Sequence, residues 1–399
     1  MGTQEMNTVP PVGTRPAHRR ALIVEAGIRL FSEVGYTGVS MADIARAVNV
    51  QPSALYRHFG GKDALFAAAA RQSIAPVRAA LDHPADFDGI LRALAAAALD
   101  SRAAGVLWLR EARHAPADVR GELREEYAEV AGLLRTGLCR ERPGLEEEQA
   151  ELLAACILAG LASVSFHRIQ LPPRRFTKLL YEAFRRVAHA SLPEMHAGPP
   201  APVEGSSGSG RLVMRSRREG IVGAAARLIA ERGVASLTIE EIGEAAGIAG
   251  PSVYNYFSGK QELLAAVLNR GNEWLWAEVT RVFAHAGSTE EAVDGLLRSY
   301  LVLAVEHGMA SVLIGDLGHL AAQDRERFRQ AQHDYLREWS ALLSPDGSQQ
   351  EEAAARVRVN MAIMIINHAA RTPDLRRLPH AEPALLHIAK AALGSSAVV

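Results

Sequence analysis

Apolar residues near the start of the chain recur at helical spacing between polar capping residues. Residues 23–34 place apolar side chains three and four positions apart, which predicts a first helix from Arg19, and Gly35 follows as a stop signal. In residues 39–44, Ser40 can cap a second helix while Asp43 returns the bond, and apolar residues flank the cap as a hydrophobic staple. A third helix is predicted to run to Phe59, and a fourth to begin at Lys62.

The same pattern occurs a second time. Residues 23–66 and 221–264 align without a gap, 198 positions apart. Thr238 and Glu241 repeat the helix cap, the third helix is expected to end at Phe257, and Lys260 opens the fourth helix. A self-match of this length indicates a duplicated unit in one polypeptide. The identical pairs include Ala26/Ala224, Arg29/Arg227, Leu30/Leu228, Gly35/Gly233, Ile44/Ile242, Tyr56/Tyr254, Phe59/Phe257, Lys62/Lys260 and Leu65/Leu263.

The remaining sequence predicts further helices. Residues 64–190 and 262–393 carry Ala and Leu at helical spacing, broken at prolines and glycines, and no alternating strand pattern bounded by hairpin turns occurs. The longest apolar stretch, residues 152–166, is too short to span a bilayer and is interpreted as a buried core helix. The fold is therefore expected to be all-α.

Composition limits the function classes. The net charge of -1 gives no overall basicity, so a role in nucleic-acid binding requires locally clustered positive charge. Two cysteines, Cys139 and Cys156, and no signal-peptide pattern favour a reducing, cytoplasmic location. Each copy is preceded by a basic arm, formed by Arg15, His18, Arg19 and Arg20 in the first and by Arg211, Arg215, Arg217 and Arg218 in the second.

Within each copy, the second and third helices form a candidate helix-turn-helix. Small residues stand where the two helices would cross, Ala45 and Val48 in the first copy and Gly243 and Ala246 in the second. The second helix of such a pair must present polar side chains to DNA. The candidates are Gln51, Ser53, Tyr56, Arg57 and His58 in the first copy, and Pro251, Ser252, Tyr254, Asn255 and Tyr256 in the second.

The segments VQPSALYRHFGGKDAL and IAGPSVYNYFSGKQELL resemble the DNA-binding signature of TetR/AcrR-type bacterial transcriptional regulators. The resemblance implies two units, each a three-helix DNA reader joined through a fourth helix to an all-α ligand-binding and dimerisation domain. The expected divisions are a disordered arm over 1–14, readers over 15–66 and 214–264, helical effector domains over 67–191 and 265–394, and a flexible linker over 192–213, where GPPAPVEGSSGSG stands.

The resemblance also implies residue roles. Tyr56 and Tyr254 would bond phosphate, and Lys62 and Lys260 would meet phosphate at the fourth helix. The helix caps Ser40 and Thr238 would hold a further phosphate with adjacent N–H groups. The basic residues Arg19, Arg20, Arg217 and Arg218, with His58 and Tyr256, complete the predicted DNA-contact set.

Specificity is expected from the polar residues that differ between the copies. In the first reader these are Gln51, Ser53 and Arg57, since arginine suits the guanine O6/N7 edge. In the second they are Ser252 and Asn255, since asparagine suits adenine. The two readers would then prefer different half-sites. An alternative for both signature tyrosines is a plain packing role.

The resemblance implies that the last two long helices of each half pair with their counterparts. The matching ranges are 147–168 with 176–190, and 351–371 with 384–393. Two such pairs in one chain predict an intramolecular pseudo-dimer, and a dimer of chains with four readers stays open as an alternative.

An unidentified small-molecule effector is expected inside each helical domain. Candidate lining residues are Trp108, Phe166, His167, Trp274, Tyr300 and His307, although apolar residues at helical spacing are more often core. Asp316 and His319, near His307, lack further clustered ligands, so neither a metal nor another cofactor is predicted.

The leading hypothesis is a ligand-responsive transcriptional repressor that binds a pseudo-palindromic operator and is released by its effector. The alternative is that one unit reads DNA while the other is a degenerate dimerisation or effector-binding module. Glu240, Glu241 and Glu244 support that alternative, because acidic groups weaken phosphate attraction in the second reader. No nucleophile elbow, phosphate-binding glycine loop or zinc spacing occurs, so the chain is not predicted to be an enzyme.

Overall fold

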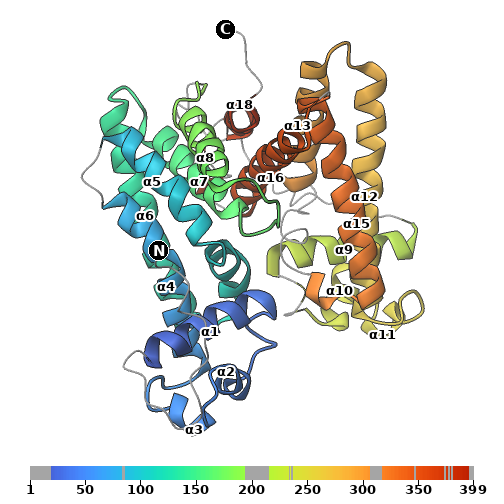
Figure 1. Cartoon of the computed structure of the whole chain (residues 1–399). Coiled ribbons are helices and arrows are strands. Elements are labelled where there is room, and N and C mark those ends of the chain that lie inside the picture. Colours follow the sequence, from blue (N-terminus) through green and yellow to red (C-terminus); the bar gives the residue numbers. More distant parts are fainter. Residues whose placement is uncertain are drawn as a thin grey trace. The chain divides into compact units, whose positions relative to one another are not determined.

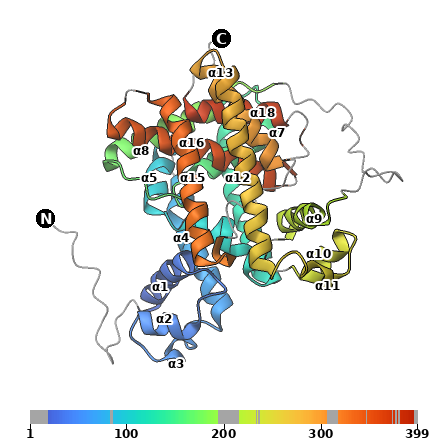
Figure 2. The same cartoon turned by 90° about the vertical axis from the view of Figure 1, so that its right-hand side faces the viewer.

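The computed structural model of the chain is built from helices (Figures 1 and 2). It describes residues 19–82, 86–193, 215–232, 237–305, 317–345, 347–372 and 381–394, with the single residues 234, 374, 375 and 378. No strand occurs in these ranges, which confirms the all-α prediction. The predicted disordered arm over 1–14 and most of the predicted linker lie outside the described residues.

The first reader consists of α1 (Arg19–Glu33), α2 (Met41–Ala47) and α3 (Pro52–Leu55), followed by α4 (Lys62–Leu81). Gly35 ends α1 with a φ of +94°, a left-handed conformation that glycine adopts without a steric penalty. The predicted start at Arg19, the stop at Gly35 and the start of the fourth helix at Lys62 are all confirmed. The core of this reader includes Ile23, Phe31, Ile44, Leu55 and Phe66, all fully buried.

The second reader consists of α9 (Arg217–Arg232), α10 (Ile239–Ala245) and α11 (Gly250–Val253), followed by α12 (Lys260–His285). Its two short helices cross at Gly243, where an added Cβ would lie 2.8 Å from the Cα of Gly250. The first reader has Ala45 at the matching position, almost fully buried. The prediction that small residues permit the crossing is therefore confirmed at Gly243 and Ala45.

The predicted helix caps are present in both readers. The Ser40 hydroxyl accepts the Asp43 N–H at 3.2 Å, and the Asp43 carboxylate accepts the Ser40 N–H at 3.0 Å. Thr238 and Glu241 repeat this arrangement at 3.2 and 2.8 Å. Each cap provides side-chain acceptors for two N–H groups at the helix start, where no preceding turn supplies the usual helical acceptors.

The third helix of each reader is shorter than predicted. The sequence pattern predicted helices to Phe59 and Phe257, but α3 ends at Leu55 and α11 at Val253. The chain then continues as a turn in which His58 N–H donates to the Leu55 carbonyl at 2.9 Å and Phe59 N–H to the same oxygen at 3.0 Å. The Phe59 and Phe257 side chains are buried in the core. Their spacing from the preceding apolar residues is helical, which is why the sequence pattern predicted a longer helix.

The structure divides into two compact units. The first holds the described residues up to Glu141 together with Leu161–Arg168, and the second holds Arg142–Gly160 together with the described residues from Ile169 onward. None of the helices in the described part of the chain is both long and apolar enough to cross a membrane.

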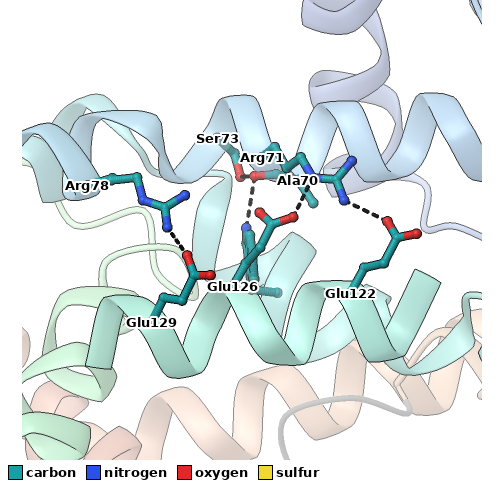
Figure 3. A network of polar contacts seen from close by, with 8 residues as sticks. Ala70, Arg71, Ser73, Arg78, Glu122, Glu126 and Glu129 are labelled. Atoms are coloured by element: carbon teal, nitrogen blue, oxygen red, sulfur yellow. Dashed lines mark hydrogen bonds and ion pairs between the residues drawn. The ribbon is translucent and has the colours of Figure 1, made fainter. Parts of the chain in front are cut away.

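In the first unit, α4 packs against α5 (Phe87–Asp100) and α6 (Ala117–Glu141). Figure 3 shows α4 and α6 joined by ion pairs, in which Arg71 meets Glu122 at 2.6 Å and Glu126 at 2.5 Å, and Arg78 meets Glu129. Between α5 and α6 the chain forms a short π-helix, η1 (Val106–Glu111), and a 3₁₀ turn, η2 (Ala112–His114). The sequence pattern did not predict the π-helix.

The second unit contains helices from both halves of the chain. From the first half come α8 (Pro173–Ala188) and α7 (Glu147–Ser163) up to Gly160. α13 (Thr289–Val305), η3 (Leu317–His319), α15 (Ala322–Leu343), α16 (Gln349–Arg371) and α18 (Ala381–Leu393) come from the second half. In Figure 2, α12 and α15 run alongside each other, in agreement with their contacts.

The helix containing the long apolar stretch ends earlier than predicted. α7 stops at Ser163, and Phe166 follows in a turn where its N–H donates to the Ser163 carbonyl at 3.0 Å. Residues 152–164 are buried throughout, so the prediction of a buried core helix holds up to this turn.

Removal of the Ser40 cap tests the local stability of α2. In Ser40→Ala, the Asp43 N–H loses its side-chain acceptor, so we expect the opening free energy of the α2 amides to fall by about 1 kcal/mol. Hydrogen exchange without DNA measures this change. Ser40→Thr keeps the hydroxyl and should retain most of the protection, whereas equal protection in Ser40→Ala would contradict a stabilising cap.

Candidate nucleic-acid interface

The first reader presents a polar face at α3 and the turn that follows it. Gln51, Ser53, Arg57 and His58 are exposed. The Tyr56 side chain is 56% exposed, although its neighbours Leu55 and Phe59 are buried. The short helix therefore holds its apolar side in the core and turns the predicted contact residues to solvent.

The second reader presents the corresponding face with different chemistry. Tyr254 is 55% exposed and Tyr256 is 38% exposed. Asn255 is exposed and Ser252 is half-buried. Since both signature tyrosines have more than half of their surface in solvent, core packing does not account for them.

One arginine of each basic arm is anchored on the reader itself. The Arg20 guanidinium lies over the Phe59 ring, 4.9 Å from its centre, and the Arg218 guanidinium lies 5.1 Å from the centre of the Phe257 ring. Such cation–π contacts fix a charge that would otherwise move freely. Arg217 is exposed and Arg19 is half-buried.

The two signature lysines have different surroundings. The Lys62 amine lies 4.3 Å from the centre of the Tyr36 ring, and partial burial lowers its pKa. The Lys260 amine donates to the Leu237 carbonyl at 2.6 Å, next to the cap of α10. Lys260 therefore binds the backbone immediately before α10, whereas Lys62 lies over an aromatic ring.

The carboxylates at the helix caps are held in their charged form. Hydrogen bonds from the Ser40 side chain and backbone lower the pKa of Asp43 to about 2. The Thr238 backbone and hydroxyl bonds lower the pKa of Glu241, which also pairs with Arg232 at 3.2 Å. One of the three acidic residues that argued against the second reader therefore belongs to the cap, while Glu240 and Glu244 are exposed.

The predicted effector-lining residues are distributed over both units. In the first unit Trp108 is half-buried and its indole N–H donates to the Ala70 carbonyl at 2.9 Å, while Phe166 and His167 are half-buried in the turn after α7. In the second unit Trp274 is half-buried and Tyr300 is buried. His307 lies outside the described residues, and the effector-lining assignments stay predictions.

The predicted aromatic Tyr300 lies in a buried cluster. Its hydroxyl accepts from the Asn367 amide at 2.9 Å. Its ring stacks on Tyr335 and meets Trp339 edge-on, with centroids 6.4 Å apart in both pairs. Tyr300 is therefore a core aromatic with a satisfied hydroxyl group in this structure.

No group of three or more potential metal ligands occurs among the described residues. His319 is half-buried within η3, and Asp316 lies outside the described ranges. Both cysteines are free, Cys139 exposed and Cys156 buried.

Three polar residues around the first reader were missed by the sequence analysis. The Tyr36 hydroxyl donates to Asp63, and the Tyr36 N–H donates to the buried Glu111 at 2.8 Å. The aligned copies contain a signal for two of them, because Tyr36 and Asp63 stand opposite Val234 and Gln261. Glu111 lies outside the aligned segments, so their comparison could not find it.

Comparison with known protein families identifies both readers. The family model for "Bacterial regulatory proteins, tetR family" matches residues 23–69 and 221–267. The HTH-type transcriptional repressor KstR2 of Mycolicibacterium smegmatis is 32% identical over 99 residues, covering 25% of this chain and 48% of that protein. KstR2 of Rhodococcus jostii is 27% identical over 154 residues, covering 37% of this chain and 73% of that protein. The chain spans about half the length of the first curated relatives that it matches.

Partial matches among solved structures include two transcriptional regulators. The ketosteroid transcriptional regulator KstR2 of Mycobacterium tuberculosis has a TM-score of 0.36 and 20% identity, covering 45% of this chain and 95% of that one. A tetR-family regulatory protein from Rhodococcus has a TM-score of 0.38 and 20% identity, covering 43% and 98%.

The family match falls on both copies of the capping and turn geometry described above. Both readers therefore match the DNA-binding domain of the tetR family of bacterial regulatory proteins, so the chain contains two TetR-type units in tandem.

Proposed function

We propose that this chain is a DNA-binding transcriptional repressor whose two readers contact one pseudo-palindromic operator from a single polypeptide, and not an enzyme. A small-molecule effector releases it. The observation that carries the proposal is the double occurrence of a capped helix-turn-helix that exposes its signature tyrosine, Tyr56 or Tyr254, beside polar residues.

The exposed faces suggest how the operator is read. Tyr56, Lys62 and the N-terminus of α2 provide phosphate contacts, which fix the orientation of the reader on the duplex. Arg57 stands where Asn255 stands in the second reader, and both side chains are exposed. Since these side chains favour guanine and adenine respectively, the two half-sites should differ in sequence.

Packing between helices of the two halves supports the pseudo-dimer. In the second unit α8 packs against α16 and α18. The Arg186 guanidinium donates to the Ala391 carbonyl at 2.9 Å, near the C-terminal end of α18, where a positive charge is favoured. Arg175 donates to the Gln350 side chain at 2.5 Å.

A close approach at Gly160 gives the same pairing a steric basis. An added Cβ at Gly160 in α7 would lie 3.2 Å from Cγ of Met361 in α16. Met361 is fully buried. Helices from the first and second halves therefore pack here with no room for a larger side chain.

The proposed effector sites and location rest on the burial of two tryptophans and on the free cysteines. The half-buried aromatic residues Trp108 and Trp274 remain the proposed lining of effector sites, one in each half. Free cysteines are compatible with a cytoplasmic location. In the second candidate function only the first reader binds DNA, and the second unit serves for dimerisation or effector binding. The exposed Glu240 and Glu244 of α10 favour this alternative, because their carboxylates repel phosphate.

Separate tyrosine variants distinguish two readers from one. A duplex selected from random DNA by the unmodified protein is the probe. Tyr56→Ala and Tyr254→Ala should each weaken binding about tenfold or more and should affect different half-sites, because each removes a phosphate contact and part of the reading face. A silent Tyr254→Ala beside a severe Tyr56→Ala would support the single-reader alternative.

The mass of the particle tests the pseudo-dimer. Light scattering at micromolar concentration should give one chain of 42.9 kDa per particle, free and on the operator. Two chains per free particle would contradict an intramolecular pair and support four readers in a dimer of chains.

A larger side chain at the contact between α7 and α16 tests whether the packing of the two halves affects operator binding. In Gly160→Leu the new side chain collides with Met361, which disturbs the packing between helices of the two halves. Binding to the complete operator should weaken about tenfold or more, while binding of an isolated half-site duplex stays unchanged. Gly132→Leu is the matched control, since nothing lies within 4 Å of a Cβ at Gly132 in α6. Equal full-site affinity for both variants would refute this role of the pairing.

A further inference from the structure

The π-helix η1 (Val106–Glu111) lies against the first reader. It contacts α1 and α4, and its Trp108 side chain donates to the Ala70 carbonyl of α4 at 2.9 Å. Its last residue, Glu111, is only 5% exposed. A carboxylate is rarely buried unless it is paired and hydrogen-bonded, so the partners of Glu111 show what its burial achieves.

Those partners belong to the turn after α1. Glu111 Oε2 accepts the Tyr36 N–H at 2.8 Å, and Oε1 accepts from Arg110 Nε at 2.6 Å. Arg110 Nη2 donates in turn to the Ser32 carbonyl at 3.0 Å. The two consecutive residues of η1 thus hold both sides of the turn that separates α1 from α2.

Gly35 makes room for this contact. Its φ is +94°, and an added Cβ would lie 3.2 Å from Glu111 Oε2. The turn therefore depends on glycine for two reasons, its left-handed backbone and the close approach of the carboxylate.

The held turn connects directly to the DNA-facing residues. Tyr36, whose N–H binds Glu111, donates its hydroxyl to Asp63, and the Lys62 amine lies over its ring. Burial and the bond to Asp63 raise the pKa of the Tyr36 hydroxyl, so it stays a proton donor. The chain then reaches the Ser40 cap four residues later. The position of Tyr36 therefore affects both proposed phosphate contacts, Lys62 and the start of α2.

The other end of η1 meets the end of α7. Gly105 N–H donates to Ser165 Oγ at 3.1 Å, and an added Cβ at Gly105 would lie 2.7 Å from the Ala162 carbonyl oxygen. The six-residue helix η1 is thus in close contact with the α7 end on one side and binds the reader at its opposite end. π-helical turns are uncommon in proteins, and those that occur are often found at functional sites.

The second reader lacks the residues for this connection. Val234 and Gln261 stand at the positions of Tyr36 and Asp63. Valine has no hydroxyl group to donate to the start of the fourth helix, and Lys260 binds the Leu237 carbonyl instead. The linkage through Tyr36 is therefore specific to the first reader.

We propose that Glu111 is a positioning residue for DNA recognition by the first reader, acting through the Tyr36 N–H, and that η1 transmits movements of the α7 end to that reader alone. This inference rests on the proposed DNA-binding function. It adds a route by which the two half-sites are controlled unequally.

Glu111→Gln tests the inference with little change in shape. The amide keeps an oxygen acceptor but removes the negative charge that Arg110 and the Tyr36 N–H share. The probes are duplexes selected from random DNA, with the first-reader half-site identified as the one whose binding depends on Tyr56. Affinity for that half-site should fall about tenfold, while affinity for the other half-site stays unchanged.

Two further variants complete the design. Glu129→Gln removes a carboxylate that pairs with Arg78 between α6 and α4, away from the reader, and should leave both affinities unchanged. Tyr36→Phe keeps the ring but removes the bond to Asp63, and should weaken the first half-site in the same direction even if Glu111→Gln fails to fold.

The outcomes separate the two levels of the proposal. Equal losses of affinity at both half-sites would show that Glu111 has a general structural role and would overturn the positioning role. Unchanged affinity for the first half-site in both Glu111→Gln and Tyr36→Phe would overturn it as well. If the unmodified protein selects no duplex at all, the proposed DNA-binding function fails, and the inference fails with it.

Discussion

The packing of α8 against α16 and α18 is the contact that joins helices from both halves of the chain within the second unit. The apolar side chains Phe176, Leu180, Phe184 and Val187 of α8 are all buried, and each contributes roughly 1.5–3 kcal/mol by leaving water. The helix is otherwise strongly polar, so this single stripe fixes which side faces the protein. Because α8 comes from the first half and its partners from the second, both halves contribute to the core of the second unit.

Electrostatics in the readers is organised at helix ends. Asp43 and Glu241 each accept hydrogen bonds from the cap residue at a helix start, and these bonds lower the pKa of each carboxylate. Both carboxylates therefore stay charged down to acidic pH, and protonation there would remove the caps. Each carboxylate is directed at the N–H group of its own cap residue, within the reader.

Local sequence rules predicted the parts of the fold that local interactions determine. The caps at Ser40 and Thr238, the stop at Gly35 and the start at Lys62 all depend on neighbours within a few residues. The third helices were overestimated because Phe59 and Phe257 keep helical spacing while they lie in a turn. Glu111 could not be predicted, since its partner Tyr36 is 75 residues away and only the folded chain brings the two together. Likewise, the different bonding of Lys62 and Lys260 depends on Tyr36, which valine replaces in the second copy.

Arg57 and Asn255 occupy equivalent exposed positions in the two readers, and this difference has an evolutionary consequence. In a regulator assembled from identical subunits, one mutation in the reading helix alters both halves of the binding site together. Under the function proposed above, a single codon change in this chain alters one half of the binding site only. The duplicated gene could then acquire an asymmetric target in small steps, each of which preserves recognition of the other half.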